Sequence, residues 1–209
     1  MRATIKTTFA LFLLLPIAAV SARPALAQTS TQLQPSTAPE MPSRAELALN
    51  YSYLHSNAPP SGCGCFNLNG GSADFAWAIK PGSWALVGDV VSGHAGNVAA
   101  PGYSITLTAF TAGVRYLPHV GHSSLIPFGQ VLVGAAHSSG SLVQAPNAGS
   151  GNAGAAFASN LGGGLDLRAS RRFSIRLLEA DYLLTTFDNG SNNHQNNLRI
   201  SAGVVFRFH

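Results

Sequence analysis

Apolar and polar side chains alternate with a period of two residues along three segments of the chain. The apolar positions are Leu47, Leu49, Tyr51 and Tyr53, then Ala73, Phe75, Trp77 and Ile79, and finally Leu198, Ile200, Ala202, Val204, Phe206 and Phe208. The opposite face carries Glu46, Ala48, Asn50 and Ser52, then Ser72, Asp74, Ala76 and Lys80, and finally Arg199, Ser201, Gly203, Val205 and Arg207. Successive side chains of a strand point to opposite faces, whereas a helix would scatter these residues, so the pattern predicts β-strands.

Five further strands are predicted between the second and the last of these segments, at residues 83–93, 104–117, 126–137, 155–168 and 174–187. The last of the five changes parity, because Ile175 and Leu177 share one face and Tyr182 and Leu184 share the other. A β-bulge near Leu178 would bring both pairs onto one face, since a bulge inserts one extra residue into a strand.

The connections between the predicted strands are rich in turn-forming residues and largely alternate between long and short. The long ones are residues 56–70, 94–103, 138–153 and 188–197, and the short ones are 81–82, 118–125 and 169–172. Seven connections imply eight strands, with both ends of the barrel domain on one side. Short turns on one side and longer loops on the other are typical of outer-membrane barrels. The sequence therefore predicts an all-β fold, an eight-stranded antiparallel up-and-down transmembrane β-barrel.

A secreted β-sandwich or a lipocalin-like barrel would also show alternation, with the apolar face inward and a charged face toward water. The composition separates the two alternatives, because 46% of the residues are hydrophobic and only 10% are charged. The polar faces carry Ser, Gly, Ala and Asn, and Lys80 is the only lysine after residue 44. This favours a membrane barrel whose apolar face meets lipid and whose polar face lines a crowded lumen.

The N-terminus is typical of a secretory signal peptide, predicted at residues 1–27. Arg2 and Lys6 precede an apolar stretch, and an Ala-Leu-Ala cleavage site ends at Ala27. Residues 28–43 are rich in Ser, Thr, Gln and Pro and are predicted to be a flexible leader. The transmembrane β-barrel domain is predicted at residues 44–209.

Cleavage of the signal peptide changes the charge of the chain. Twelve Lys and Arg residues face eight Asp and Glu residues in the precursor, and Arg2, Lys6 and Arg23 leave with the signal. The nine that remain nearly balance the acids, and only Arg171 and Arg172 are adjacent. Because nucleic-acid binding requires clustered basic residues on one face, we expect no nucleic-acid partner.

The chain resembles the OmpA-like superfamily of small eight-stranded outer-membrane barrels over residues 44–209. The resemblance rests on the signal peptide, the spacing of strands and turns, and the ending ISAGVVFRFH. Val204, Phe206 and Phe208 match the terminal signature recognised by the barrel-assembly machinery, although His209 follows the final aromatic residue. The resemblance implies a bacterial outer-membrane location, with outer-membrane lipid, the assembly machinery and periplasmic chaperones as partners, and no periplasmic domain after the barrel.

The two faces of the strands predict two sets of functional residues. The residues predicted to face lipid are Leu47, Leu49, Tyr51, Tyr53, Phe75 and Trp77. The residues predicted to form a polar network in the lumen are Glu46, Asp74, Asp89, Arg115, Asp166, Arg176, Glu179, Asp181, Arg199 and Arg207. With Lys80 and Arg168 this inward set has six acids and six bases. Because eight strands enclose only enough space for side chains, we expect the lumen to be plugged. We expect a structural or adhesion/interaction role, with the polar loops facing outward. The sequence does not identify their extracellular ligand.

Other residue patterns give less specific hypotheses. Cys63 and Cys65 form a candidate disulfide in the first loop, within the chain or between chains, because a secreted protein permits such a bond. His119 and His122 form an H-x-x-H pattern in a predicted turn, which is weak as a metal site because it supplies too few ligands. An interfacial or solvated position is favoured for both, and no metal site and no cofactor are expected.

Enzymatic activity and pore formation are the alternative functions. Lipid A deacylases among the eight-stranded barrels use a His, a Ser two residues later and an acidic residue further along. His122-Ser123-Ser124 and His137-Ser138-Ser139 match the first two members, but no Asp or Glu follows either before Asp166. Without an acid to orient the imidazole, no catalytic residue is assigned. A non-enzymatic barrel is therefore preferred to an acyl hydrolase or a small pore.

Overall fold

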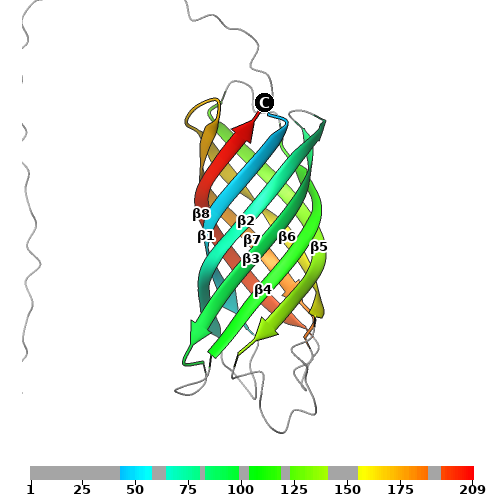
Figure 1. Cartoon of the computed structure of the whole chain (residues 1–209), viewed down its shortest axis with the longest axis vertical. Coiled ribbons are helices and arrows are strands. Elements are labelled where there is room, and N and C mark those ends of the chain that lie inside the picture. The colour runs from blue at the N-terminus through cyan, green and yellow to red at the C-terminus, as the bar shows by residue number, and fades with distance from the viewer. Residues whose placement is uncertain are drawn as a thin grey trace, which may run out of the picture. The chain divides into compact units, whose positions relative to one another are not determined.

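The computed structural model describes residues 43–57, 65–80, 83–98, 104–118, 123–140, 155–187 and 194–209. Eight antiparallel strands form a closed barrel in which each strand pairs with its neighbours along the chain and the last pairs with the first (Figure 1). The strands are β1 (Ala45–Ser56), β2 (Phe66–Lys80), β3 (Trp84–Gly96), β4 (Ser104–Tyr116), β5 (Leu125–Ser139), β6 (Ala155–Arg168), β7 (Phe173–Thr185) and β8 (Gln195–Phe208). The predicted eight-stranded antiparallel barrel is confirmed. Within the described ranges, no helix has the length and apolarity needed to cross a bilayer.

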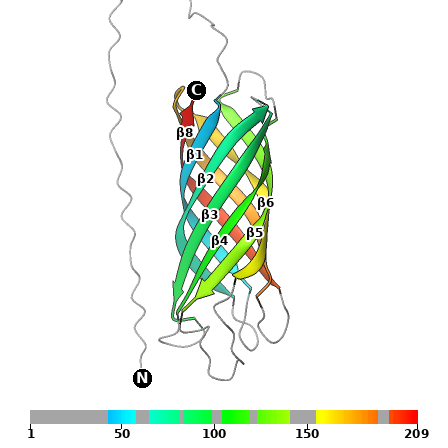
Figure 2. The ribbon, with the colours of Figure 1, turned by 45° about the vertical axis from the view of Figure 1, so that its right-hand side comes forward.

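The barrel has two rims that differ in their connections. At the terminal rim, where β1 begins and β8 ends, the Arg44 amide donates to the Phe208 carbonyl oxygen at 2.8 Å (Figure 2). The strands are joined there through residues 81–83, 117–124 and 169–172. At the opposite rim, here called the loop rim, they are joined through residues 57–65, 97–103, 140–154 and 186–194.

Several strands continue further toward the loop rim than the sequence predicted. Residues 66–70, predicted as part of the first loop, belong to β2, and β3, β5 and β8 are likewise extended at this end. Polar side chains replace apolar ones on the outward face here. His55 Nδ1, for example, lies 2.7 Å from Asn67 Oδ1, and His94 Nδ1 lies 2.9 Å from Thr106 Oγ1. Backbone pairing requires no apolar residue, so the ladder continues where the alternation that predicts strands has faded.

The bulge predicted near Leu178 is confirmed. The pairing of β7 with β8 shifts between Arg176 and Glu179, and Leu177 and Leu178 are both exposed on the outer surface. A second irregularity lies in β2 between Ala78 and Lys80. As a result, Lys80 is exposed at the terminal rim and does not share the inward face of Asp74, to which the simple alternation assigned it.

Large apolar side chains cover the outside of the barrel. They are 39% to 60% exposed over all eight strands and include Leu49, Tyr51, Phe75 and Trp77. Leu47 and Tyr53 lie on the same face and are half-buried. We call this surface the outer belt. An apolar surface of this extent is far larger than the patches that water-soluble monomers expose.

The inside of the barrel contains apolar side chains at both ends. Toward the loop rim, a cluster that includes Leu54, Leu68, Leu107 and Leu183 is at most 6% exposed, and we call it the loop-side plug. A smaller cluster of Ala76, Ala85, Val87 and Leu132 lies toward the terminal rim. Buried polar and charged residues occupy the rest of the lumen.

Two glycines provide a matched test of how closely the strands approach. A Cβ atom at Gly134 would lie 2.0 Å from the Phe110 carbonyl oxygen, whereas one at Gly88 would meet no atom within 4 Å. We expect Gly134→Ala to lower the free energy of unfolding by about 1–3 kcal/mol, because paired backbones must separate. Gly88→Ala should change it by about 0.5 kcal/mol or less. Denaturant unfolding of the detergent-solubilised barrel measures both, and equal losses would contradict this packing.

Candidate functional site: a charged network inside the barrel

A network of ionic and polar side chains crosses the middle of the lumen. We define the lumen network as Asp74 on β2, Asp89 on β3, Arg115 on β4, Gln130 on β5, Asp166 on β6, Arg176, Glu179 and Asp181 on β7, and Arg199 on β8. Each of these residues is at most 5% exposed. Strand alternation places all of them inside while their neighbours in sequence point outward. Seven of the eight strands therefore meet through side chains as well as through the backbone.

Arg176 is bonded to carboxylates from three strands. Its Nη1 donates to Asp74 Oδ2 at 2.6 Å and to Glu179 Oε2 at 3.0 Å. Its Nε donates to Asp166 Oδ1 at 2.9 Å. The planar guanidinium has five N–H donors in a fixed arrangement, so one arginine can hold several carboxylates at once.

Arg199 makes a second group of this kind. Its Nη1 donates to Asp89 Oδ2 at 2.8 Å, and its Nη2 donates to Asp181 Oδ2 at 2.6 Å and to Glu179 Oε1 at 3.1 Å. Glu179 thus accepts from both Arg176 and Arg199 through different oxygens. This shared carboxylate connects the two groups into one network.

The bulge in β7 is what allows Arg176 and Glu179 to meet. On a regular strand, residues three positions apart point to opposite faces. The extra residue at Leu177 and Leu178 restores both charged side chains to the inside, where their charged groups lie 3.0 Å apart. The local irregularity therefore aims two charges at each other, a known use of bulges.

Gln130 and Phe128 on β5 complete the network, and sequence reasoning missed both. Gln130 Oε1 accepts from Arg115 Nε at 3.0 Å, and its Nε2 donates to Glu179 Oε1 at 2.8 Å. The centroid of the Phe128 ring lies 4.3 Å from Arg115 Cζ and 4.6 Å from Arg176 Cζ. Both residues lie an even number of positions from Leu132 and therefore on the same inward face of β5, which the sequence alone could have shown. An uncharged amide and a phenyl ring, however, do not indicate a charged network.

The expected balance of six acids and six bases is not what the network contains. Five carboxylates, of Asp74, Asp89, Asp166, Glu179 and Asp181, surround the three guanidiniums of Arg115, Arg176 and Arg199. Lys80 is exposed and Arg168 is half-buried at the terminal rim. Glu46 and Arg207, also predicted for the network, form a separate pair at that rim with 3.1 Å between Oε1 and Nε. Because acids exceed bases, Arg176 and Arg199 are each shared by three carboxylates, and losing either one leaves several carboxylates uncompensated.

The remaining predicted residues lie outside the network. Phe206 and Phe208 of the terminal signature are exposed on the outer belt, and Phe206 packs edge-to-face on Phe173 with ring centroids 5.9 Å apart. Their role in assembly stays a prediction, as does that of half-buried Val204. Cys65 is exposed, whereas Cys63 and the pair His119 and His122 lie outside the described residues, so the disulfide also stays a prediction.

The His-x-Ser motif at His137 lies on the outer surface of β5. His137 is exposed and Ser139 shares its outward parity, while Ser138 points inward. In the described part of the chain, every Asp and Glu belongs to the inward-facing set, so none reaches this histidine across the wall. The same part of the chain holds no cluster of three His, Cys, Asp or Glu side chains suited to a metal ion.

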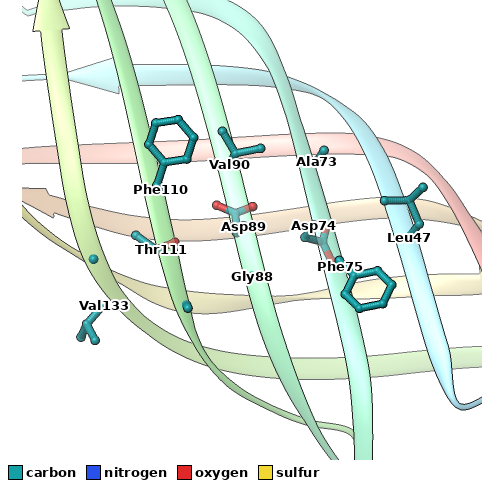
Figure 3. A pocket seen from close by; sticks show the side chains of 12 residues that line it. Leu47, Ala73, Asp74, Phe75, Gly88, Asp89, Val90, Phe110, Thr111 and Val133 are labelled. Carbon is teal, nitrogen blue, oxygen red and sulfur yellow. The ribbon is translucent and has the colours of Figure 1, made fainter.

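A shallow depression of about 550 Å³ lies on the outer wall over β1 to β5 (Figure 3). It opens above Gly88, and Leu47, Phe75, Phe110 and Val133 surround it. The outward-facing side chains that line it are apolar, and Asp74 and Asp89 belong to the lumen network behind the wall. The depression is an irregularity of the outer belt and presents no group for catalysis.

The comparisons with known proteins agree with this architecture. No protein-family model and no curated protein matches the chain significantly. Among solved structures, Neisserial surface protein A (NspA) matches with a TM-score of 0.58 at 15% identity, covering 79% of this chain and 98% of that one. OprG of Pseudomonas aeruginosa matches with a TM-score of 0.52 at 9% identity, covering 81% of this chain and 98% of that one. Ail, the attachment invasion locus protein of Yersinia pestis, matches with a TM-score of 0.50 at 16% identity, covering 79% of this chain and 99% of that one. The chain thus has the fold of the small eight-stranded outer-membrane barrels, as the resemblance found in the sequence implied.

Removal of one shared guanidinium should destabilise the barrel strongly. We expect Arg199→Met to lower the free energy of unfolding by about 3–5 kcal/mol, because Asp89, Asp181 and Glu179 would remain buried without their partner. Arg171→Met, at an exposed position, should change it by about 0.5 kcal/mol or less. Urea unfolding in detergent micelles compares the two variants, and similar small effects would show that the network contributes little.

The ring of Phe128 should stabilise the barrel through its contacts with two guanidinium cations. We expect Phe128→Leu to cost about 1–2 kcal/mol, since leucine fills much of the space but has no π face for Arg115 and Arg176. Phe157, which is 52% exposed on the outer belt, provides the matched control. Phe157→Leu should cost about 0.5 kcal/mol or less. The same unfolding measurement applies, and an equal loss at both positions would argue against the cation–π contacts.

Proposed function

We propose that the chain is an integral outer-membrane protein whose plugged barrel serves as a rigid scaffold for outward-facing loops, with a structural or interaction role. The outer belt supports the membrane location. Its apolar side chains would be unfavourable in water and are suited to lipid, and each strand is long enough to cross a bilayer at the usual tilt. The residues predicted to face lipid all lie on this belt.

Aromatic side chains near both ends of the belt support the same proposal. Trp77, Trp84 and Tyr116 lie toward the terminal rim, where the rings of Trp84 and Tyr116 are 4.8 Å apart. Tyr51 and Tyr182 lie toward the loop rim, where their hydroxyls donate to Asn69 and Asn196. Aromatic girdles mark the two interfaces in membrane barrels. The terminal rim then faces the periplasm and the loop rim faces the outside.

The filled lumen is the observation that carries the scaffold role. Leu54, Leu132 and Arg199 are fully buried, and Arg115 and Arg176 are only 1% exposed. An eight-stranded barrel has little interior beyond the volume of its side chains, and here these side chains are tied together by ionic hydrogen bonds. A route for ions would require both the loop-side plug and the lumen network to open, which disfavours a pore.

The loop-rim connections are where we place the interaction role. Binding specificity usually lies in loops held by a rigid scaffold, and these connections are long and rich in Gly, Ser, Ala and Asn. We further propose outer-membrane lipid, the barrel-assembly machinery and periplasmic chaperones as partners during insertion, with Phe206 and Phe208 as part of the assembly signal.

The purified protein should insert into planar bilayers without producing a steady current. Insertion is checked in parallel on vesicles, in which the unboiled protein should migrate differently from the boiled protein on gels because the closed barrel unfolds slowly. Reproducible, ion-selective conductance steps would overturn the plugged scaffold in favour of a pore. A single mobility together with recovery in the soluble fraction of cells would reject the membrane location.

A further inference from the structure

The exposed positive charges of the described barrel are confined to one rim. Arg44, Lys80, Arg171 and Arg172 are exposed, and we call them the basic collar. Arg44 precedes β1, Lys80 ends β2, and the two adjacent arginines lie between β6 and β7. Backbone hydrogen bonds tie these residues to the neighbouring strands. The Ala78 amide of β2 donates to the Arg44 carbonyl oxygen at 2.9 Å, and the Arg207 amide of β8 donates to the Arg172 carbonyl oxygen at 2.9 Å.

Within the described residues, no ion pair neutralises the basic collar. None of the ion pairs found among the described residues includes any of its four members. Glu46, the acid at this rim, accepts from Ser43 Oγ at 2.8 Å and is paired with Arg207. The collar is therefore a net positive surface rather than a set of surface salt bridges.

The loop rim, in contrast, has no Lys or Arg in its connections. The sequence contains no Lys or Arg between Arg44 and Lys80, between Lys80 and Arg115, between Arg115 and Arg168, or between Arg176 and Arg199. All four loop-rim connections fall within these intervals. The outward polar side chains of the strands near this rim include histidines and uncharged residues such as Asn67 and Thr108. The difference in positive charge between the two rims therefore holds for the entire barrel sequence, including its loops.

Aromatic residues of the outer belt lie directly beside the basic collar. Trp77 and Trp84 flank Lys80 in sequence and are about half exposed, and Phe173 follows Arg172. Aromatic rings locate the boundary between acyl chains and headgroups, so cations just beyond them lie at the depth of lipid phosphates. Arg and Lys bind phosphate oxygens through charge-assisted hydrogen bonds.

We propose that the basic collar binds the phosphate headgroups of anionic phospholipids in the leaflet next to the terminal rim. This inference rests on the proposed membrane location and adds a lipid preference to it. The loop rim, which lacks cations, should show no such preference. Binding of this kind would favour the orientation in which the terminal rim meets the phospholipid leaflet.

The two tryptophans of the chain report on this site directly, since both lie beside Lys80. The folded protein is placed in phosphatidylcholine vesicles that contain equal mole fractions of either brominated phosphatidylglycerol or brominated phosphatidylcholine. We expect quenching by the anionic lipid to exceed quenching by the zwitterionic one by about twofold or more, because basic residues at a membrane surface attract anionic lipid. High salt should reduce the ratio toward one, since screening weakens exposed charges.

Two matched double variants test whether the preference is local. R44Q/K80Q removes the cations next to the tryptophans and should bring the quenching ratio to about one. R171Q/R172Q removes the same charge at the β6–β7 turn and should leave the ratio at the wild-type value. Because all four residues are exposed, both variants should fold, which the gel-mobility shift verifies.

The possible results separate this proposal from the membrane location itself. A ratio of one in the wild type, or a ratio unchanged in R44Q/K80Q, would overturn the lipid preference. Equal reduction by both variants would also overturn it, because general electrostatic attraction and not a local site would then explain the enrichment. Quenching by neither lipid would reject the membrane location, and the lipid preference with it.

Discussion

The sharing of two buried guanidiniums among five carboxylates is the interaction on which the interior of this barrel depends. Arg176 and Arg199 each contact three carboxylates, and Glu179 accepts from both. These contacts connect β2, β3, β6, β7 and β8 across the lumen, so they couple strands that are not neighbours in the sheet. A buried charge is tolerated only when it is paired and hydrogen-bonded, and moving one strand by a single residue would turn its charges toward the outer belt. The network therefore penalises wrong registers, in which its charges would lose their partners.

The bulge in β7 and the network depend on each other. Without the extra residue, either Arg176 or the pair Glu179 and Asp181 would point outward, because the alternation is strict. With it, Leu177 and Leu178 are both on the outer belt and all three charged residues are inside. One local irregularity thus satisfies the apolar exterior and the ionic interior together.

The two ends of the lumen differ in their apolar content. A larger apolar cluster lies toward the loop rim, a smaller one lies toward the terminal rim, and ionic side chains tie the strands together across the lumen. Outside, charge is divided in the same direction, with the basic collar at one rim and uncharged polar residues at the other. Under the proposed scaffold role, interactions would occur at the surfaces of the barrel, namely at the loops of one end and at the collar of the other.

The sequence by itself determined the outward faces of β1, β8 and most of β2, because a strand repeats every two residues. The number of connections predicted eight strands, and the composition together with the loop pattern predicted a membrane barrel. The alternation also located the bulge, since Ile175 and Tyr182 cannot share a face otherwise. Only the tertiary structure decided which charges meet, because pairs such as Arg199 and Asp89 lie on β8 and β3 and approach only across the closed lumen. The same holds for Gln130 and Phe128, whose residue types do not signal an ionic role, and for Lys80, which the shift in β2 turns to the rim. Alternation is a local property and can be counted along the chain, whereas contacts across the lumen depend on the closure and register of the entire barrel.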